Sequence, residues 1–234
     1  MPVYLPDVFY NVLRVLKHRA KRHAAVNLLG DRDVEWSWIS SQMPAGPGEA
    51  LDFGNDGTMT GLIAVQRGFN VTAVDLTDAR FYYEHTRFRF LRGDILKLSL
   101  PREHFDLVIN CSTVEHVGLA GRYGVVGHCP DGDLEAMVRL KELLKPQGLM
   151  LLTVPVGRDA VFAPMSRIYG IHRLPRLLEG YRIEKEAFWV KNSRNKWVSC
   201  SKGAALDFKT SAGSGDMLKD VYALGCFVLA LKNE

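Results

Sequence analysis

The chain has 234 residues, of which 47% are hydrophobic and 24% are charged, and its formal net charge at pH 7 is +4. This composition excludes a disordered or fibrous protein, and the length suffices for one large α/β domain with a well-buried core. The four cysteines have no paired spacing, residues 1–16 lack the charged and then apolar pattern of a leader, and no apolar run is long enough to span a bilayer. We therefore expect a cytoplasmic protein without membrane contact.

The first part of the chain is predicted to be helical. Residues 7–29 carry apolar side chains at helical spacing, residues 33–42 favour a short second helix, and residues 44–48 (Pro-Ala-Gly-Pro-Gly) have the composition of a linker. We therefore predict an N-terminal helical segment or cap over residues 1–44 and an α/β domain over residues 45–234.

Strands and helices alternate through the second part of the chain. Continuous apolar runs, which a strand buried on both faces requires, alternate with helical patterns, so we expect parallel strands joined by right-handed crossovers. The tail adds two strands with no helical pattern between them, which pair most simply as antiparallel neighbours at a sheet edge. The expected fold is Rossmann-like and doubly wound, with a mostly parallel seven-stranded sheet and an antiparallel last strand. The predicted strands are 49–53, 70–75, 88–91, 105–110, 149–155, 181–190 and 221–231, the helices 58–68 and about 131–144 (capped by Asp131 or Asp133), and the polar loop 199–216.

Polar residues follow the carboxyl ends of four predicted strands. Gly54 closes the first, Asp75 the second and Asp94 the third, and residues 110–116 follow the fourth. Ligands of open α/β sheets bind beyond these ends, so we expect the side chains to converge on one rim. A glycine turn followed about 20 residues later by an acid suits a nucleotide-like cofactor, with the acid on the ribose hydroxyls.

Several motifs resemble those of class I S-adenosylmethionine-dependent methyltransferases. They are Leu51-Asp52-Phe53-Gly54, Asp75, Gly93-Asp94-Ile95, Ser112-Thr113-Val114-Glu115-His116-Val117 and Leu144-Lys145-Pro146-Gln147-Gly148. The resemblance implies that the chain binds S-adenosyl-L-methionine, with Gly54 at its methionine part, Asp75 at its ribose and Asp94 at its adenine. The chain departs from the first motif at Asp56, where the family has its second glycine. The implied cofactor-binding residues are Asp52, Gly54, Asn55, Gly57, Asp75, Leu76, Asp94, Ile95, Cys111 and Ser112.

A narrower resemblance covers more of the chain. Motifs within residues 115–118, 121–124, 130–134, 154–157 and 167–170 resemble a little-characterised methyltransferase-like family that is catalogued as a domain of unknown function. That family implies no substrate.

His116 is the candidate catalytic base. Transfer of a methyl group to an alcohol needs a base near neutral pH, and histidine has the intrinsic pKa for this task. Glu115 is expected to orient His116 or to contact the cofactor. The alternative is that His116 packs against the cofactor or satisfies a backbone group.

The acceptor is expected to meet Arg122, Tyr123, Tyr169 and His172, because aromatic faces beside cations suit sugars, phosphates or carboxylates. Surface and core packing is the alternative explanation for each of these residues. Helix capping accounts for the acids near Cys129, so no metal site is predicted.

The sequence therefore favours a methyltransferase that acts on oxygen or nitrogen of a small molecule, such as a sugar or a secondary-metabolite-like acceptor. The alternatives are an NAD(P)-dependent oxidoreductase, which the glycine spacing permits, and a catalytically inactive binding protein of the same fold, which Asp56 favours. The basic residues within 17–23 are expected on the solvated face of a helix, so a nucleic-acid partner is not favoured.

Overall fold

The computed structural model describes residues 31–55, 57, 59–81, 83–121, 123–192, 196–210 and 222–232. The predicted helix at 7–29 and the basic cluster at 17–23 lie outside these residues, as do Asp56 and Arg122. The predicted second helix is confirmed as α2 (Asp31–Gln42), while the division of the chain at residue 44 stays a prediction.

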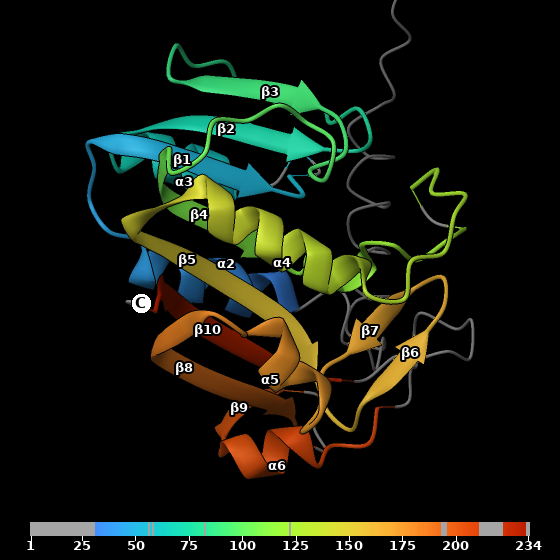
Figure 1. Ribbon diagram of the computed structural model, residues 1–234. Helices are drawn as coiled ribbons and strands as arrows, with labels where there is room; N and C mark the ends of the chain where they lie inside the picture. Colours follow the sequence, from blue (N-terminus) through green and yellow to red (C-terminus); the bar gives the residue numbers. More distant parts are fainter. Residues whose placement is uncertain are drawn as a thin grey trace, which may run out of the picture.

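Eight strands form one sheet, in the order β3-β2-β1-β4-β5-β10-β8-β9 (Figure 1). The first five in this order are parallel to one another, as their apolar sequences predict. In β4, for example, every residue except Asp106 is buried. These five strands are β1 (Gly48–Phe53), β2 (Phe69–Asp75), β3 (Phe88–Arg92), β4 (Phe105–Cys111) and β5 (Leu144–Val156).

The tail strands complete the sheet in an order that differs from the order of the sequence. Strand β10 (Ala223–Leu231) lies between β5 and β8 (Tyr181–Lys191) and is antiparallel to both. The predicted antiparallel pair is thus confirmed, but β10 is internal to the sheet. A further strand, β9 (Trp197–Cys200), pairs with β8 at the edge, and α6 (Lys202–Leu206) follows it. The sheet therefore has eight strands instead of seven, and the prediction of a continuous loop from residue 199 was wrong.

Helices cover both faces of the sheet. Figure 1 shows α4 (Gly132–Leu143) in front of the sheet and α2 and α3 (Thr60–Gln66) behind it. Strand side chains alternate between these faces, so that Leu51 and Phe53 pack in the core on the α4 side, whereas Ala50 packs with Ile39 of α2. The short helix α5 (Arg173–Leu177) lies on the α4 side.

A short hairpin stands outside the main sheet. Strands β6 (Ala160–Phe162) and β7 (Ser166–Ile168) pair with each other, and β7 contacts the 3-10 helix η1 (Val114–His116) that follows β4. The hairpin therefore lies against the segment that carries Glu115 and His116.

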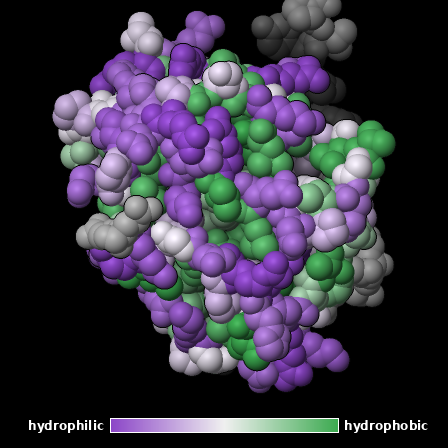
Figure 2. Space-filling model, viewed as in Figure 1, coloured by the Kyte–Doolittle hydropathy of each residue, from purple (hydrophilic) through white to green (hydrophobic). Residues whose placement is uncertain are grey.

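The outer surface is mostly hydrophilic on the face drawn in Figure 2. One hydrophobic area lies at the side where Figure 1 shows the loop between η1 and α4. This loop includes Val126, whose exposed fraction is 95%. Among the described residues, no helix has the length and the apolar composition that crossing a membrane requires.

Candidate functional site

A cavity of about 700 Å³ opens at the carboxyl ends of β1 to β4. Its volume lies within the range of small-molecule and cofactor sites. The structure brings the ends of these strands together with residues of α2 and of the loop after η1. The predicted cofactor residues that line the cavity are Gly54, Gly57, Asp75, Leu76, Asp94, Ile95 and Ser112.

Three of the predicted cofactor residues, Asp52, Asn55 and Cys111, do not line the cavity. Asp52 is buried on the α3 side of β1, where its Oδ2 accepts hydrogen bonds from Asn55 Nδ2 at 2.5 Å and from Thr60 Oγ1 at 2.8 Å. The Asp52 carboxylate therefore connects the turn that contains Gly54 and Asn55 to α3. Burial raises the pKa of Asp52 to about 6, against the effect of these hydrogen bonds.

Gly54 is required by the packing of the turn. Its φ is +79°, a conformation that glycine adopts without strain, and a Cβ at this position would overlap the side chain of Thr113. Its N–H donates to Val74 O at 2.8 Å. The absence of a side chain at Gly54 thus lets Thr113 and the turn form one wall of the cavity.

Two carboxylates stand side by side along the rim. Asp75 Oδ1 accepts from the N–H and the hydroxyl of Thr77, both at 2.9 Å. Asp94 Oδ1 accepts from Leu96 N at 3.0 Å, and its Oδ2 lies 3.5 Å from Lys97 Nζ. Local bonds therefore fix the direction of both side chains at the ends of β2 and β3.

The His116 ring is held by the hairpin. Its Nδ1 lies 2.6 Å from the carbonyl oxygen of Met165, which can only accept, so Nδ1 carries a proton. Glu115 Oε1 lies 3.7 Å from Nε2. Glu115 itself is buried and does not line the cavity, whereas His116 does. The carboxylate of Glu115 thus lies beside the Nε2 edge of the His116 ring, at the wall of the cavity.

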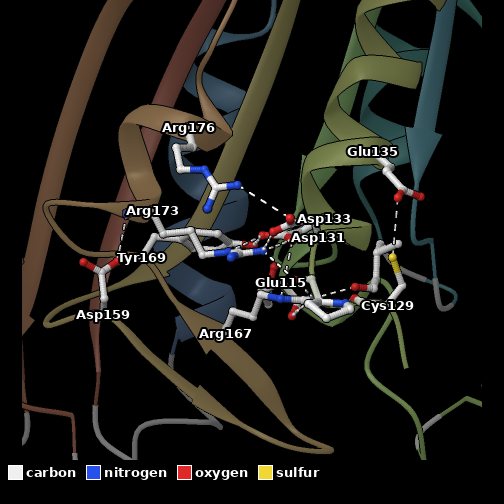
Figure 3. Close-up of polar contacts among 12 residues, drawn as sticks. Glu115, Cys129, Asp131, Asp133, Glu135, Asp159, Arg167, Tyr169, Arg173 and Arg176 are labelled. Atoms are coloured by element: carbon white, nitrogen blue, oxygen red, sulfur yellow. Dashed lines mark hydrogen bonds and ion pairs between the residues drawn. The ribbon is translucent and has the colours of Figure 1, made fainter. Parts of the chain in front are cut away.

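A buried guanidinium organises the loop between η1 and α4 (Figure 3). Arg167 of β7 has an exposed fraction of 1%, and it donates to the carbonyl oxygens of Glu115, Val117, Cys129 and Pro130 at 3.3, 2.6, 3.0 and 3.2 Å. The carbonyls of Glu115 and Val117 lie in η1 and directly after it, and those of Cys129 and Pro130 lie just before α4. Arg167 therefore links the two ends of the loop between η1 and α4.

Asp133 supplies the countercharge of this guanidinium. It is fully buried, lies 3.4 Å from Arg167 Nε, and accepts from Arg173 at 2.5 and 2.9 Å and from the hydroxyl of Tyr169 at 3.0 Å. Asp131 stands at the N-cap position of α4, one of the two predicted positions, but its side chain makes no capping hydrogen bond, and Asp133 lies in the first turn of the helix. Two arginines and a tyrosine use the Asp133 carboxylate instead.

The predicted acceptor residues are not all at the cavity. Tyr123 lines it, with a φ of +54° and its ring 5.8 Å from that of His116. Tyr169 is buried with its hydroxyl on Asp133, and burial followed by the charge of Asp133 raises its pKa well above the usual value. His172 is exposed beside Asp159 and does not line the cavity either. The structure therefore brings only Tyr123 of this set to the site, and Arg122 lies outside the described residues.

Three residues of α2 belong to the site and were missed. Arg32 and Trp36 line the cavity, and the buried Glu35 accepts from Arg32, from Thr153 and from Ser112. The sequence does carry a signal for them. Glu35 lies four residues before the buried Ile39, so it shares the apolar face of the helix, where an unpaired acid would be costly.

A family model described as "Caenorhabditis protein of unknown function, DUF268" matches residues 96–199, which agrees with the expected resemblance to a family of unknown function. No curated protein matches the sequence.

Solved structures match over most of the chain. A putative methyltransferase from Bacillus halodurans superposes with a TM-score of 0.59, at 16% identity over 86% of this chain and 100% of the other. A second match is the 1,6-didemethyltoxoflavin-N1-methyltransferase of Burkholderia thailandensis, with bound 1,6-didemethyltoxoflavin and S-adenosylhomocysteine (TM-score 0.54, 16% identity, 99% and 93% covered). The chain has the Rossmann-like methyltransferase fold. A third match, the [4+2]-cyclase SpnF, shares this fold with a different activity (TM-score 0.58, 14% identity, 85% and 80% covered).

Replacing Asp133 by asparagine is expected to lower the free energy of unfolding by about 3 kcal/mol, because the buried Arg167 and the partly buried Arg173 lose their shared countercharge. Urea denaturation measures this. Asp131→Asn is the matched control: Asp131 also pairs with Arg173, but its side chain is 51% exposed, so the change should cost less than about 1 kcal/mol. Equal effects of the two variants would contradict the role given to Asp133.

The raised pKa of Asp52 predicts a pH dependence of stability. The folded protein holds a proton on Asp52 that the unfolded chain releases above about pH 4, so the free energy of unfolding falls as pH rises from about 4 through 6. A shift of this size amounts to about 3 kcal/mol. Urea denaturation at several pH values should show this fall in the wild type relative to Asp52→Asn, whose amide does not titrate. Parallel profiles would contradict the raised pKa.

Proposed function

We propose that the protein is an S-adenosylmethionine-dependent methyltransferase that acts on oxygen or nitrogen of a small molecule. The observation that carries this proposal is one cavity at the strand ends, lined by the glycine turn, by Asp75 and Asp94, and by His116. A sugar or a secondary-metabolite-like compound is the proposed kind of acceptor.

The residues of the cavity fit S-adenosylmethionine. A Cβ is lacking at Gly54 and Gly57, and carboxylates stand where a ribose and an adenine amino group would offer donors. The methyl-bearing sulfonium of this cofactor supplies a strong electrophile, so the protein mainly needs to position the acceptor and exclude water. The solved methyltransferases of the same fold, one of them with bound S-adenosylhomocysteine, support this choice of cofactor.

The sheet order favours this function over that of a dinucleotide-dependent oxidoreductase. The dinucleotide-binding fold is classically an all-parallel sheet of order 3-2-1-4-5-6. Here an antiparallel strand, β10, stands next to β5 instead. The [4+2]-cyclase among the structural matches illustrates that this fold also hosts other reactions, so the chemistry must be argued from the residues of the cavity.

His116 is the proposed base, and Glu115 positions it. Nδ1 of His116 carries a proton and donates a hydrogen bond to Met165 O. Nε2 is therefore the ring atom that accepts the proton of the acceptor hydroxyl or amine in this proposal. S-adenosylmethionine would supply the methyl group: the acceptor lone pair would form the new bond to the methyl carbon, and the electron pair of the broken carbon–sulfur bond would stay on sulfur. Glu115, 3.7 Å from Nε2, stabilises the imidazolium that results. Tyr123, whose ring lies beside His116, is the proposed wall of the acceptor site.

Calorimetry should show that the wild type binds S-adenosylhomocysteine and does not bind NAD. Asp75→Asn should weaken binding of S-adenosylhomocysteine by about 10- to 100-fold, because a hydrogen bond to a charged group is lost. The control is Asp78→Asn, since Asp78 is 77% exposed, pairs with Arg92 and does not line the cavity. Binding of NAD alone would reverse the choice of function, and binding of neither ligand would favour an inactive protein of this fold.

His116→Asn keeps a donor for Met165 O and removes Nε2. We expect it to leave the affinity for S-adenosylhomocysteine within about twofold and to slow methyl transfer by about 100- to 10,000-fold, the usual contribution of a general base. The rate is followed as formation of S-adenosylhomocysteine with an acceptor found by screening. His104→Asn, at the far end of β4 beside Glu49, is the control. Undiminished turnover with normal cofactor affinity would remove the proposed role of His116.

A further inference from the structure

We propose that the acceptor is a flat aromatic compound, methylated on a ring hydroxyl or a ring amine, and that the loop between η1 and α4 binds its ring through Tyr123, Val125 and Val126. This inference rests on the proposed function, because it names the substrate class of the same cavity. It selects the aromatic compounds among the secondary-metabolite-like acceptors and makes sugars the competing outcome. It also accounts for the hydrophobic area at the side of the molecule where this loop lies (Figure 2).

The cavity has a charged end and an apolar end. Asp75 and Asp94 follow β2 and β3, whereas His116 and the loop after it follow β4, which lies on the other side of β1. With the adenosine of the cofactor at the two carboxylates, the end beside His116 is left for the acceptor. Arg32 also lines the cavity, but its charge is balanced by the buried Glu35 at 3.1 Å.

The loop presents apolar groups to the acceptor end. Val117, Val125 and Val126 line the cavity there, together with Tyr123 and three glycines of the loop. Within the described part of residues 117–127, the Tyr123 hydroxyl is the only polar side-chain group. A sugar hydroxyl that is buried without a hydrogen-bond partner weakens binding. This part of the lining therefore suits an aromatic ring with few hydroxyls better than a sugar.

The hydroxyl groups before η1 are already used as donors within the protein. Ser112 donates to Glu35, and Thr113 Oγ1 donates to the carbonyl oxygen of Cys111 at 3.1 Å. A sugar would need several donors and acceptors at this end of the cavity. An aromatic compound with one reacting hydroxyl mainly needs an acceptor for its proton, and the proposed base His116 is that group.

The acidity of the acceptor supports the same choice. A phenol has a pKa of about 10, whereas an aliphatic hydroxyl is about as weakly acidic as water, whose pKa is about 16. A phenol proton therefore passes to a histidine more easily than the proton of a sugar hydroxyl. The ring oxygen or nitrogen would form the new bond to the methyl carbon, the electron pair of the carbon–sulfur bond would stay on sulfur, and the proton would pass to His116.

Tyr123 has the geometry of an aromatic contact. Its φ of +54° lies in the left-handed region, which is rare for a bulky residue and concentrates at ligand sites. Its ring lies 5.8 Å from that of His116, at an interplanar angle of 60°. A third ring can meet one of these rings with its face and the other with its edge, which are the arrangements that aromatic pairs prefer. An aromatic acceptor in this corner lies next to the proposed base.

Val126 gives the acceptor an apolar surface to cover. Its exposed fraction of 95% is larger than that of any other large hydrophobic residue that the structure describes, although it lines the cavity. A Cβ at Gly124 or Gly127 would meet no atom within 4 Å outside the adjoining residues, so the loop tip has space around it. Burial of this apolar surface against an aromatic ring favours binding of the acceptor.

The test compares three probes on the wild type saturated with S-adenosylhomocysteine. 2-Naphthol is a flat aromatic alcohol, decahydro-2-naphthol is its saturated analogue, and methyl α-D-glucoside represents sugars. Calorimetry should show that 2-naphthol binds about 10-fold more tightly than either of the other probes, because only a flat aromatic ring makes both ring contacts. With S-adenosylmethionine in place of the product, 2-naphthol should also be methylated on its hydroxyl.

Variants of the loop locate the binding of the ring. Tyr123→Leu should weaken binding of 2-naphthol by about 3- to 10-fold, whereas Tyr123→Phe, which keeps the ring, should stay within about twofold of the wild type. Val126→Asp should weaken it by about 5- to 20-fold. Val138→Asp is the matched control, since Val138 is 53% exposed on α4 and does not line the cavity. All four variants should keep the affinity for S-adenosylhomocysteine, and thermal melting confirms that they are folded.

Tighter binding of the glucoside, equal binding of 2-naphthol and its saturated analogue, or no binding of any probe would overturn the aromatic acceptor. Unchanged binding of 2-naphthol in both Tyr123→Leu and Val126→Asp would overturn the role of the loop. Each of these results leaves the proposed function intact as long as the wild type binds S-adenosylhomocysteine. A wild type that does not bind S-adenosylhomocysteine would overturn the proposed function, and this inference with it.

Discussion

The guanidinium of Arg167 lies where the β6–β7 hairpin, the η1 segment and the start of α4 meet. It binds carbonyl oxygens on both sides of the loop from residue 117 to residue 129, and Asp133 balances its charge. Because a charged group loses its hydration when buried, this position is stable only with every partner in place. The η1 segment, and with it the ring of His116, therefore has its place fixed by an ion cluster outside the cavity. Met165, in the turn of the same hairpin, completes the restraint by accepting from His116.

The residues that meet at the rim of the sheet could be predicted from the sequence, because the strands that carry them are parallel. Once the strands were located, their carboxyl ends had to share one edge, and Gly54, Asp75 and Asp94 met there as expected. The face of the sheet to which a single side chain points was harder to predict. Asp52 precedes Phe53 by one residue and so faces α3, on the other side of the sheet, where Thr60 binds it.

Contacts between distant segments could not be predicted from local patterns. Asp133 has the position of a helix cap in the sequence, but its partners Arg167 and Arg173 follow 34 and 40 residues later. Glu35 bonds to Thr153, 118 residues away. No spacing rule relates such residues in a single sequence. The eighth strand was missed in the sequence for another reason, because β9 has only four residues and has no strong apolar pattern.

Because β10 lies between β5 and β8, the sheet cannot be completed before β10 has been synthesised. As the polypeptide emerges from the ribosome, β1 to β5 can pair with one another, whereas β8 and β9 can form only a detached hairpin. Docking of this hairpin waits for residues 223–231, because β10 supplies the backbone partners on both sides. Until then the exposed edge of β5 offers unpaired N–H and C=O groups to other chains. We therefore expect translation stalled before β10 to yield an aggregation-prone intermediate with this edge exposed.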